Sequence, residues 1–170
     1  MSKITDFYNG RGVDQHGRTL EFILAQDDAW WEECHDHIQW VLPTNKPSQF
    51  NPNAPLLTLE DIVLFKSSNI MVANARMSFH RFISFLGLQY DFSHNRIHAG
   101  PNFASLLEPV WLIPNHNHLR VTRCLEFLKL IGSYNELDAF YQFLVGMRNV
   151  YYKEISISGP SIYWAKAYRS

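Results

Sequence analysis

A histidine and a glutamine stand one helical turn apart in the first third of the chain, and their side chains could do polar chemistry together. His35 and Gln39 lie in a stretch whose apolar spacing predicts an amphipathic helix over residues 27–42, on which they share a face beside the apolar arc. An imidazole there is either a buried, hydrogen-bonded group that ties the helix to a loop around Asn51, or a general acid or base at the edge of an aromatic pocket. His35 is therefore the candidate catalytic residue, and His35, Gln39, Trp40 and Asn51 are candidate ligand-binding residues.

The neighbouring histidine does not extend this set to a metal site. Residues two apart on a helix point about 200° apart around its axis, so His35 and His37 cannot chelate one ion from a helix. Cys34 and Cys124 make no paired-cysteine motif, and Cys34 is expected in the core because it lies on the apolar arc. Nucleophile elbows, glycine-rich phosphate loops and zinc-protease motifs are also missing from the sequence. We predict no metal and no cofactor.

A second candidate site precedes and opens a helix predicted over residues 119–131. Asn117 stands just before this helix, and Arg120 and Arg123 lie one turn apart at its start. A helix N-terminus presents free N–H groups to anions, so these three residues could hold a phosphate or carboxylate of a ligand. Arginine serves internal salt bridges equally well, which leaves a structural role open. The internal partners would then be Glu32, Asp36 or Asp61.

Tryptophans supply a further alternative. Trp30, Trp31, Trp40 and Trp111 could form an aromatic cage for a cation or a planar ligand, or they could be core residues of a domain in which 15% of residues are aromatic.

The elements that must position these residues are mostly helices. Apolar spacing and capping residues predict helices over residues 27–42, 58–65, 69–86, 119–131 and 136–151. Residues 1–18 are expected to form an irregular arm, residues 43–55 a proline-rich loop, and residues 88–114 loops with at most one short helix. Residues 152–170 are expected to be a C-terminal extension with a short strand over residues 155–158 and a final helical turn or two. The fold prediction is mainly all-α: one compact helical domain over residues 1–170 with long proline-rich loops.

Composition narrows the function classes. The 170 residues are 46% apolar and carry a net charge of −1, which favours a globular domain and argues against a general binder of nucleic acid. Acidic residues predominate in residues 1–65 and basic residues in residues 66–123, which indicates either helices of opposite charge packed together or an anion-binding face. The sequence shows no signal peptide and no span of about 18 apolar residues. We therefore expect a cytoplasmic protein without a membrane span; the oligomeric state has no signal in the sequence.

Two motifs resemble a known family. The run from His35 to Pro43, followed by Ser48, Phe50-Asn51, Ala54-Pro55 and Leu57-Thr58, is similar to the signature of the opioid growth factor receptor conserved region. The segment from Asn117 to Arg123, and the Leu-x-x-Leu-Gly that ends at Gly132, resemble a second motif of that family. Phe7-Tyr8-Asn9 resembles its opening. The resemblance spans about residues 7–151.

The resemblance implies a ligand-binding function. Animal members are described as receptors for the peptide Met-enkephalin that are associated with the nuclear envelope and restrain growth, and they continue into charged, repetitive regions. This chain is expected to be a compact stand-alone member that binds a small molecule or peptide in a cleft between residues 27–42, the loop over residues 43–55 and the start of the 119–131 helix. The alternatives are a small enzyme that uses His35 as acid or base, and a module that binds protein or nucleic acid.

Overall fold

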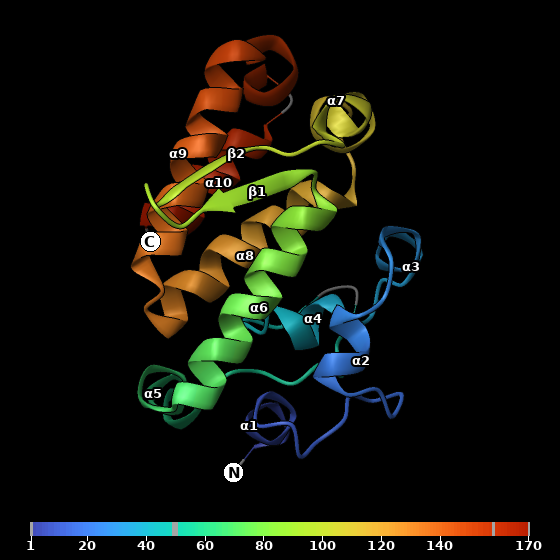
Figure 1. Cartoon of the computed structure of the whole chain (residues 1–170), viewed down its shortest axis with the longest axis vertical. Helices are drawn as coiled ribbons and strands as arrows, with labels where there is room; N and C mark the ends of the chain where they lie inside the picture. The colour runs from blue at the N-terminus through green and yellow to red at the C-terminus, as the bar shows by residue number, and fades with distance from the viewer. Residues whose placement is uncertain (1, 49–50, 158, 170) are drawn as a thin grey trace. The chain divides into compact units, whose positions relative to one another are not determined.

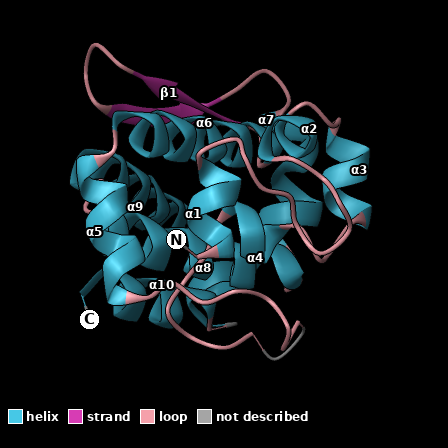
Figure 2. Cartoon of the chain, turned by 90° about the horizontal axis from the view of Figure 1, so that it is seen from below, coloured by secondary structure: helices cyan, strands magenta, loops and turns pink. Residues whose placement is uncertain are grey.

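The computed structural model of the chain describes residues 2–48, 51–157 and 159–169. By their internal contacts the residues group into two compact units, Met1–Arg81 and Phe82–Ser170. Helices dominate both units, and the strands of the described residues form a single hairpin (Figures 1 and 2), which confirms the all-α class. One domain over residues 1–170 stays a prediction.

The first unit is built from short helices followed by two longer ones. They are α1 (Lys3–Tyr8), α2 (Leu20–Leu24), α3 (Asp28–Glu33), α4 (Ile38–Val41), α5 (Leu59–Ser67) and most of α6 (Asn69–Phe85). A capping box opens α5: the Thr58 hydroxyl accepts a hydrogen bond from the Asp61 backbone N–H, and the Asp61 carboxylate accepts one from the Thr58 N–H. Helices α5 and α6 confirm the predictions for residues 58–65 and 69–86.

Helix α1 shows that an irregular arm over residues 1–18 is wrong for its first part. Ser2 caps this helix, and Phe7 and Tyr8 on it are fully buried. The Tyr8 ring packs edge-on against Phe65 at 4.7 Å between centroids, and Phe7 packs against Trp40 at 5.3 Å. The Tyr8 hydroxyl donates a hydrogen bond to the Val41 carbonyl. Helix α1 therefore contributes aromatic side chains to the core of the first unit.

The single helix expected over residues 27–42 is also wrong, because the structure divides it into α3 and α4. Cys34 has extended backbone angles (φ −84°, ψ 111°) where α3 ends, and α4 begins only at Ile38. The connecting residues are held by a partner distant in sequence: Arg18 donates to the Asp36 carboxylate at 2.7 Å. Apolar spacing could not reveal this long-range pairing.

The second unit begins with the last turn of α6 and a hairpin. The expectation of loops with at most one short helix over residues 88–114 is therefore wrong, because this segment holds the hairpin and two helical elements. Strands β1 (Leu88–Asp91) and β2 (Arg96–Ala99) pair antiparallel, with Leu88 opposite Ala99. Gly87, at φ +81°, ends α6 in the left-handed region, and its carbonyl accepts a hydrogen bond from the Gly100 N–H at 2.8 Å.

The rest of the second unit is helical. Its elements are α7 (Phe103–Leu106), the π-helix η1 (Leu107–Leu112), α8 (His116–Ile131), α9 (Tyr134–Val150), the π-helix η2 (Tyr152–Ile157) and α10 (Pro160–Arg169). Helices α8 and α9 confirm the predictions for residues 119–131 and 136–151. The strand expected over residues 155–158 is wrong, because η2 occupies its first part; Ser158 lies outside the described residues.

Helix α10 packs against both α8 and α9. Trp164 is 1% exposed and donates from its indole Nε1 to the His118 carbonyl at 3.2 Å. The Tyr168 ring stacks on Tyr141 at 4.0 Å between centroids, and the Lys129 ammonium donates to the Tyr168 carbonyl at 2.9 Å. Residues 160–169 are thus an integral layer of this unit and not a peripheral extension.

Candidate functional site

The break between α3 and α4 contains His35 and His37, and the two side chains have different surroundings there. His35 is exposed, and its Nδ1 lies 2.7 Å from the Glu33 carbonyl. His37 is fully buried, with ring centroids 4.7 Å from Trp31 and 5.0 Å from Trp30. His35 therefore does not share a helix face with Gln39, contrary to the prediction, because the two belong to different segments. Its role as an acid or base stays a prediction.

Cys34 and Asp36, within the same break, belong to a polar network. Arg18 donates to the Cys34 thiol at 3.1 Å, and the thiol donates to Asp36 at 3.1 Å. Burial, together with the hydrogen bond to Asp36, raises the pKa of the Cys34 thiol, while Arg18 acts in the opposite direction. The expected core position of Cys34 is wrong: the side chain is half-buried among charged partners.

The loop after α4 is closed at its base and carries two of the motif residues. The Leu57 N–H donates to the Thr44 carbonyl at 3.0 Å, so the chain leaves and returns at one point in the manner of an Ω-loop. Inside the loop, the Ser48 hydroxyl accepts hydrogen bonds from the Gln39 Nε2 at 3.4 Å and from the Asn51 backbone N–H at 3.2 Å. The structure thus brings two predicted site residues together around Ser48.

Three hydrogen-bonding atoms at this place have no partner among the described residues. They are Gln39 Oε1, Trp40 Nε1 and Asn51 Nδ2, and each of these atoms is buried. Gln39 is 5% exposed and Trp40 is 3% exposed. Leaving a buried polar atom unpaired costs about 1–3 kcal/mol, and such atoms are few in native proteins. We call Gln39, Trp40, Ser48 and Asn51 the amide cluster.

Ser48 is the member of the amide cluster that sequence reasoning missed as a site residue. It stands in the family-like motif between Pro43 and Asn51. Its place in the motif was the only sequence feature that could have marked Ser48 as a site residue. A lone serine in a proline-rich loop has no spacing pattern that predicts which side chains it contacts.

The arginine site predicted in the second unit is largely buried. Arg120 is 5% exposed, donates to the Asn117 Oδ1 at 3.2 Å and lies over the Phe85 ring at 5.6 Å. Burial lowers the pKa of Arg123, with the charge of Glu126 acting in the opposite direction. Both arginines are therefore partly or wholly withdrawn from water. Anion binding by Asn117, Arg120 and Arg123 stays a prediction.

The start of α8 is occupied by the protein's own side chains. The Asn115 Oδ1 accepts a hydrogen bond from the Asn117 N–H at 2.8 Å, as an N-cap does. The next residue, His118, is buried, and its Nε2 lies 3.1 Å from the Trp111 carbonyl. Burial lowers the pKa of His118, with the hydrogen bonds to the Trp111 and Val110 backbone acting in the opposite direction, so the surroundings favour the neutral imidazole.

Two of the tryptophans proposed for an aromatic cage are core residues. Trp31 and Trp111 are fully buried, and their indole nitrogens donate to the carbonyls of Ile23 at 3.0 Å and Leu86 at 3.1 Å. Trp30 is half-buried, with the Arg18 guanidinium 5.4 Å from its ring centroid. Because they are fully buried, Trp31 and Trp111 offer no exposed ring face to a cation or planar ligand.

The described residues hold neither a cluster of metal ligands nor a membrane-spanning helix. Within residues 2–48, 51–157 and 159–169, no three His, Cys, Asp or Glu side chains gather in a way that could hold a metal ion. Over the same part of the chain, none of the helices combines the length and apolar character needed to cross a bilayer.

These features define an all-α domain with a closed polar loop after a one-turn helix, and comparisons with known proteins give its family. Residues 9–158 match the family described as the opioid growth factor receptor (OGFr) conserved region, so the chain belongs to that family. No solved structure was found to match it.

Named relatives are considerably longer than the matched region. The opioid growth factor receptor of Mus musculus is 31% identical over 59% of this chain, and that of Rattus norvegicus is 30% identical over 78% of it. Opioid growth factor receptor-like protein 1 of Xenopus tropicalis is 29% identical over 70% of the chain. The matched regions cover 16%, 23% and 23% of these three relatives.

Proposed function

We propose that this chain is a ligand-binding module and that the amide cluster of its first unit contacts the ligand. The observation that carries the proposal is the group of three buried, uncharged hydrogen-bonding atoms, on Gln39, Trp40 and Asn51, that lack partners among the described residues. The names of the mouse and rat relatives, which call them receptors for a growth factor, support a binding role over a catalytic one.

The amide cluster favours an uncharged group on the ligand. Its unpaired atoms are one acceptor, Gln39 Oε1, and two donors, Trp40 Nε1 and Asn51 Nδ2. The complementary ligand offers acceptors to the two donors and a donor to the glutamine oxygen, as the amide groups of a small molecule or a peptide do. An anion would leave the Gln39 oxygen facing negative charge.

The closed loop positions these atoms before any ligand arrives. Ser48 fixes the Gln39 side chain and the Asn51 backbone, and the Leu57–Thr44 hydrogen bond holds the loop ends. Pre-organised groups lose little conformational entropy on binding, and a ligand that satisfies buried atoms recovers their desolvation cost.

Arg120 is assigned to supporting Asn117 inside the second unit. A cytoplasmic location also remains a prediction.

The test uses a matched pair of substitutions in the same loop. Asn51→Asp replaces the unpaired donor by an acceptor, whereas Asn53→Asp makes the same chemical change at an exposed position. The parent and both variants are unfolded thermally against a panel of neutral amides, short peptides including Met-enkephalin, and carboxylates. A ligand of the amide cluster raises the midpoint of the parent and of Asn53→Asp, and it raises that of Asn51→Asp much less.

Gln39→Met provides a second variant in case Asn51→Asp weakens the fold itself. A panel member that raises the midpoints of Asn51→Asp, Gln39→Met and the parent equally would place the binding site elsewhere. Preference for carboxylates over neutral amides would contradict the proposed ligand chemistry.

A further inference from the structure

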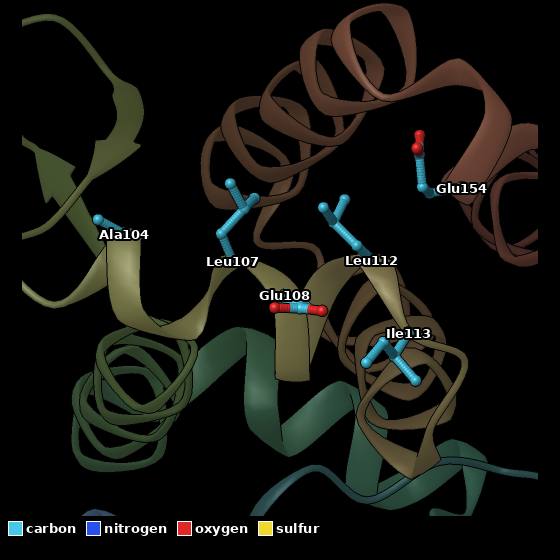
Figure 3. A pocket seen from close by; sticks show the side chains of 6 residues that line it. All are labelled: Ala104, Leu107, Glu108, Leu112, Ile113 and Glu154. Carbon is cyan, nitrogen blue, oxygen red and sulfur yellow. The ribbon is translucent and has the colours of Figure 1, made fainter.

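We propose that the second unit holds a separate binding site for an organic cation, a protonated amine attached to an apolar group. The site is a pocket of about 530 Å³ bordered by the π-helices η1 and η2 and by α7. It is lined by Ala104, Leu107, Glu108, Leu112, Ile113 and Glu154 (Figure 3). All of these residues lie in one unit, and none belongs to the amide cluster.

The apolar part of the pocket comes from the side of η1 that does not enter the core. Val110 and Trp111 of this π-helix are buried, and the Trp111 indole is hydrogen-bonded to the Leu86 carbonyl. The opposite side presents Leu107 and Leu112, whose side chains lie next to each other in Figure 3. Ile113 is 50% exposed at the edge. The pocket therefore offers an apolar wall to a ligand.

The charged part of the pocket is negative. Its lining holds the carboxylates of Glu108 and Glu154, which come from different π-helices, and contains no Lys, Arg or His. Within the described part of the chain, the Glu108 carboxylate has no hydrogen bond or ion pair. In Figure 3 Glu154 stands on the wall across from Leu112. An apolar wall with Glu108 beside it on η1 and Glu154 across from it on η2 is complementary to a cation that carries an apolar body.

The backbone of η1 holds this arrangement in place. Pro109 has no N–H, so the turn cannot form a regular α-helical ladder there, and the Ile113 N–H reaches the Glu108 carbonyl at 3.1 Å across the wider π-turn. The Asn115 amide donates to the carbonyls of Pro109, Val110 and Ile113. On the other wall, Ile155 is fully buried and anchors η2 beside Glu154. π-helical turns are rare and occur frequently at functional sites, and here two of them border one pocket.

Three probes of similar shape and different charge test the site. Benzylamine, benzyl alcohol and benzoate are titrated into isotopically labelled protein, and binding is followed by the amide and methyl NMR signals. We expect benzylamine to bind most tightly, benzoate most weakly, and the shifted signals to centre on Leu107, Leu112 and Glu154. Shifts that centre on other residues, or equal binding of benzoate and benzylamine, would overturn the proposal.

Substitutions separate the charge from the apolar wall. Glu108→Gln combined with Glu154→Gln should weaken benzylamine binding about tenfold and leave benzyl alcohol binding unchanged, because only the amine makes charge-assisted hydrogen bonds. Glu108→Gln alone is a milder variant at an exposed position, and Glu60→Gln, on α5 of the first unit, is the matched control. Unchanged benzylamine affinity in both pocket variants, or an equal loss in Glu60→Gln, would show that the two carboxylates do not form the site.

Discussion

The imidazole Nε2 of His16 lies 2.6 Å from one carboxylate oxygen of Asp36, and the other oxygen of that carboxylate accepts a hydrogen bond from Arg18 at 2.7 Å. Arg18 also binds Asp14, whose side chain is fully buried. A loop before α2 thus fixes the segment between α3 and α4. In the segment that this pairing holds, His35 is exposed and His37 is fully buried.

Asp36→Asn should lower stability at neutral pH and have less effect in acid. Burial acts to raise the pKa of Asp36, but hydrogen bonds from Arg18 and Cys34 and the charges of Arg18 and His16 outweigh it and lower that pKa. A lowered folded-state pKa stabilises the fold above the ordinary aspartate pKa, and this contribution is lost as pH falls through about 4 and below. Urea unfolding at pH 7 and pH 3 measures the change. Asp6→Asn is the control: the Asp6 side chain is 41% exposed and pairs with the exposed Arg11 at 3.7 Å, so its loss should make little difference at pH 7.

Tyr8→Phe should destabilise the first unit by about 1–2 kcal/mol, because it removes the donor to the buried Val41 carbonyl while keeping the ring that packs on Phe65. Denaturant unfolding gives the free energy. The same substitution at Tyr163, which is 62% exposed, serves as the control and should change stability by less than about 0.5 kcal/mol. Equal losses for the two variants would mean that the Tyr8 hydroxyl contributes nothing specific.

Asn115→Ala should cost about 1–2 kcal/mol and loosen η1, because this amide caps α8 and holds three carbonyls around the π-turn. Hydrogen exchange of the Leu112 and Ile113 amides reports the loosening. Asn102→Ala is the matched control, since Asn102 stands at the N-cap of α7 without a side-chain capping bond. Unchanged exchange in Asn115→Ala would remove this residue from the support of the pocket.

Arg120→Met and Arg123→Met should differ in their effect on stability. Arg120 is buried and donates to Asn117, so its loss should cost about 1–3 kcal/mol. Burial lowers the pKa of Arg123 and so disfavours its charge, and a neutral methionine there should cost less than at Arg120. Thermal and urea unfolding compare the two. A larger loss at Arg123 than at Arg120 would reverse the assignment.

Sequence patterns predicted the elements whose information is local. Helices α6, α8 and α9 keep apolar spacing over several turns, and Gly87 and Gly132 mark the ends of α6 and α8 with left-handed backbone angles. The hairpin was missed although Leu88–Asp91 and Arg96–Ala99 both alternate apolar and polar residues, because each strand is only four residues long and the prolines and glycine around them favoured loops. Its tight turn places Asn95 at φ +50°, which the sequence alone did not indicate.

The candidate site was predictable only in part, because contacts between residues distant in sequence leave no local pattern. The family-like motif pointed to Gln39, Trp40 and Asn51, and each carries a buried polar atom without a partner among the described residues. The helix face expected to be shared by His35 and Gln39 was wrong, because the chain leaves the helix between α3 and α4, where Asp36 binds Arg18 across 18 residues of sequence. Glu108 and Glu154 were not predicted, since the pocket joins two π-helical turns that have no periodicity in the sequence.

Trp164 lies beyond residue 158, where the match to the OGFr conserved region ends, yet its indole is packed inside the unit formed by α8 and α9 and binds the His118 carbonyl. Residues 9–158 alone therefore lack a side chain that fills the core of the second unit. A chimera that joins residues 9–158 to the continuation of another relative would have to supply a side chain of tryptophan size at that point. Chimeras that carry α10 along should fold, and those that exchange it should expose a hole lined by Trp111 and His118.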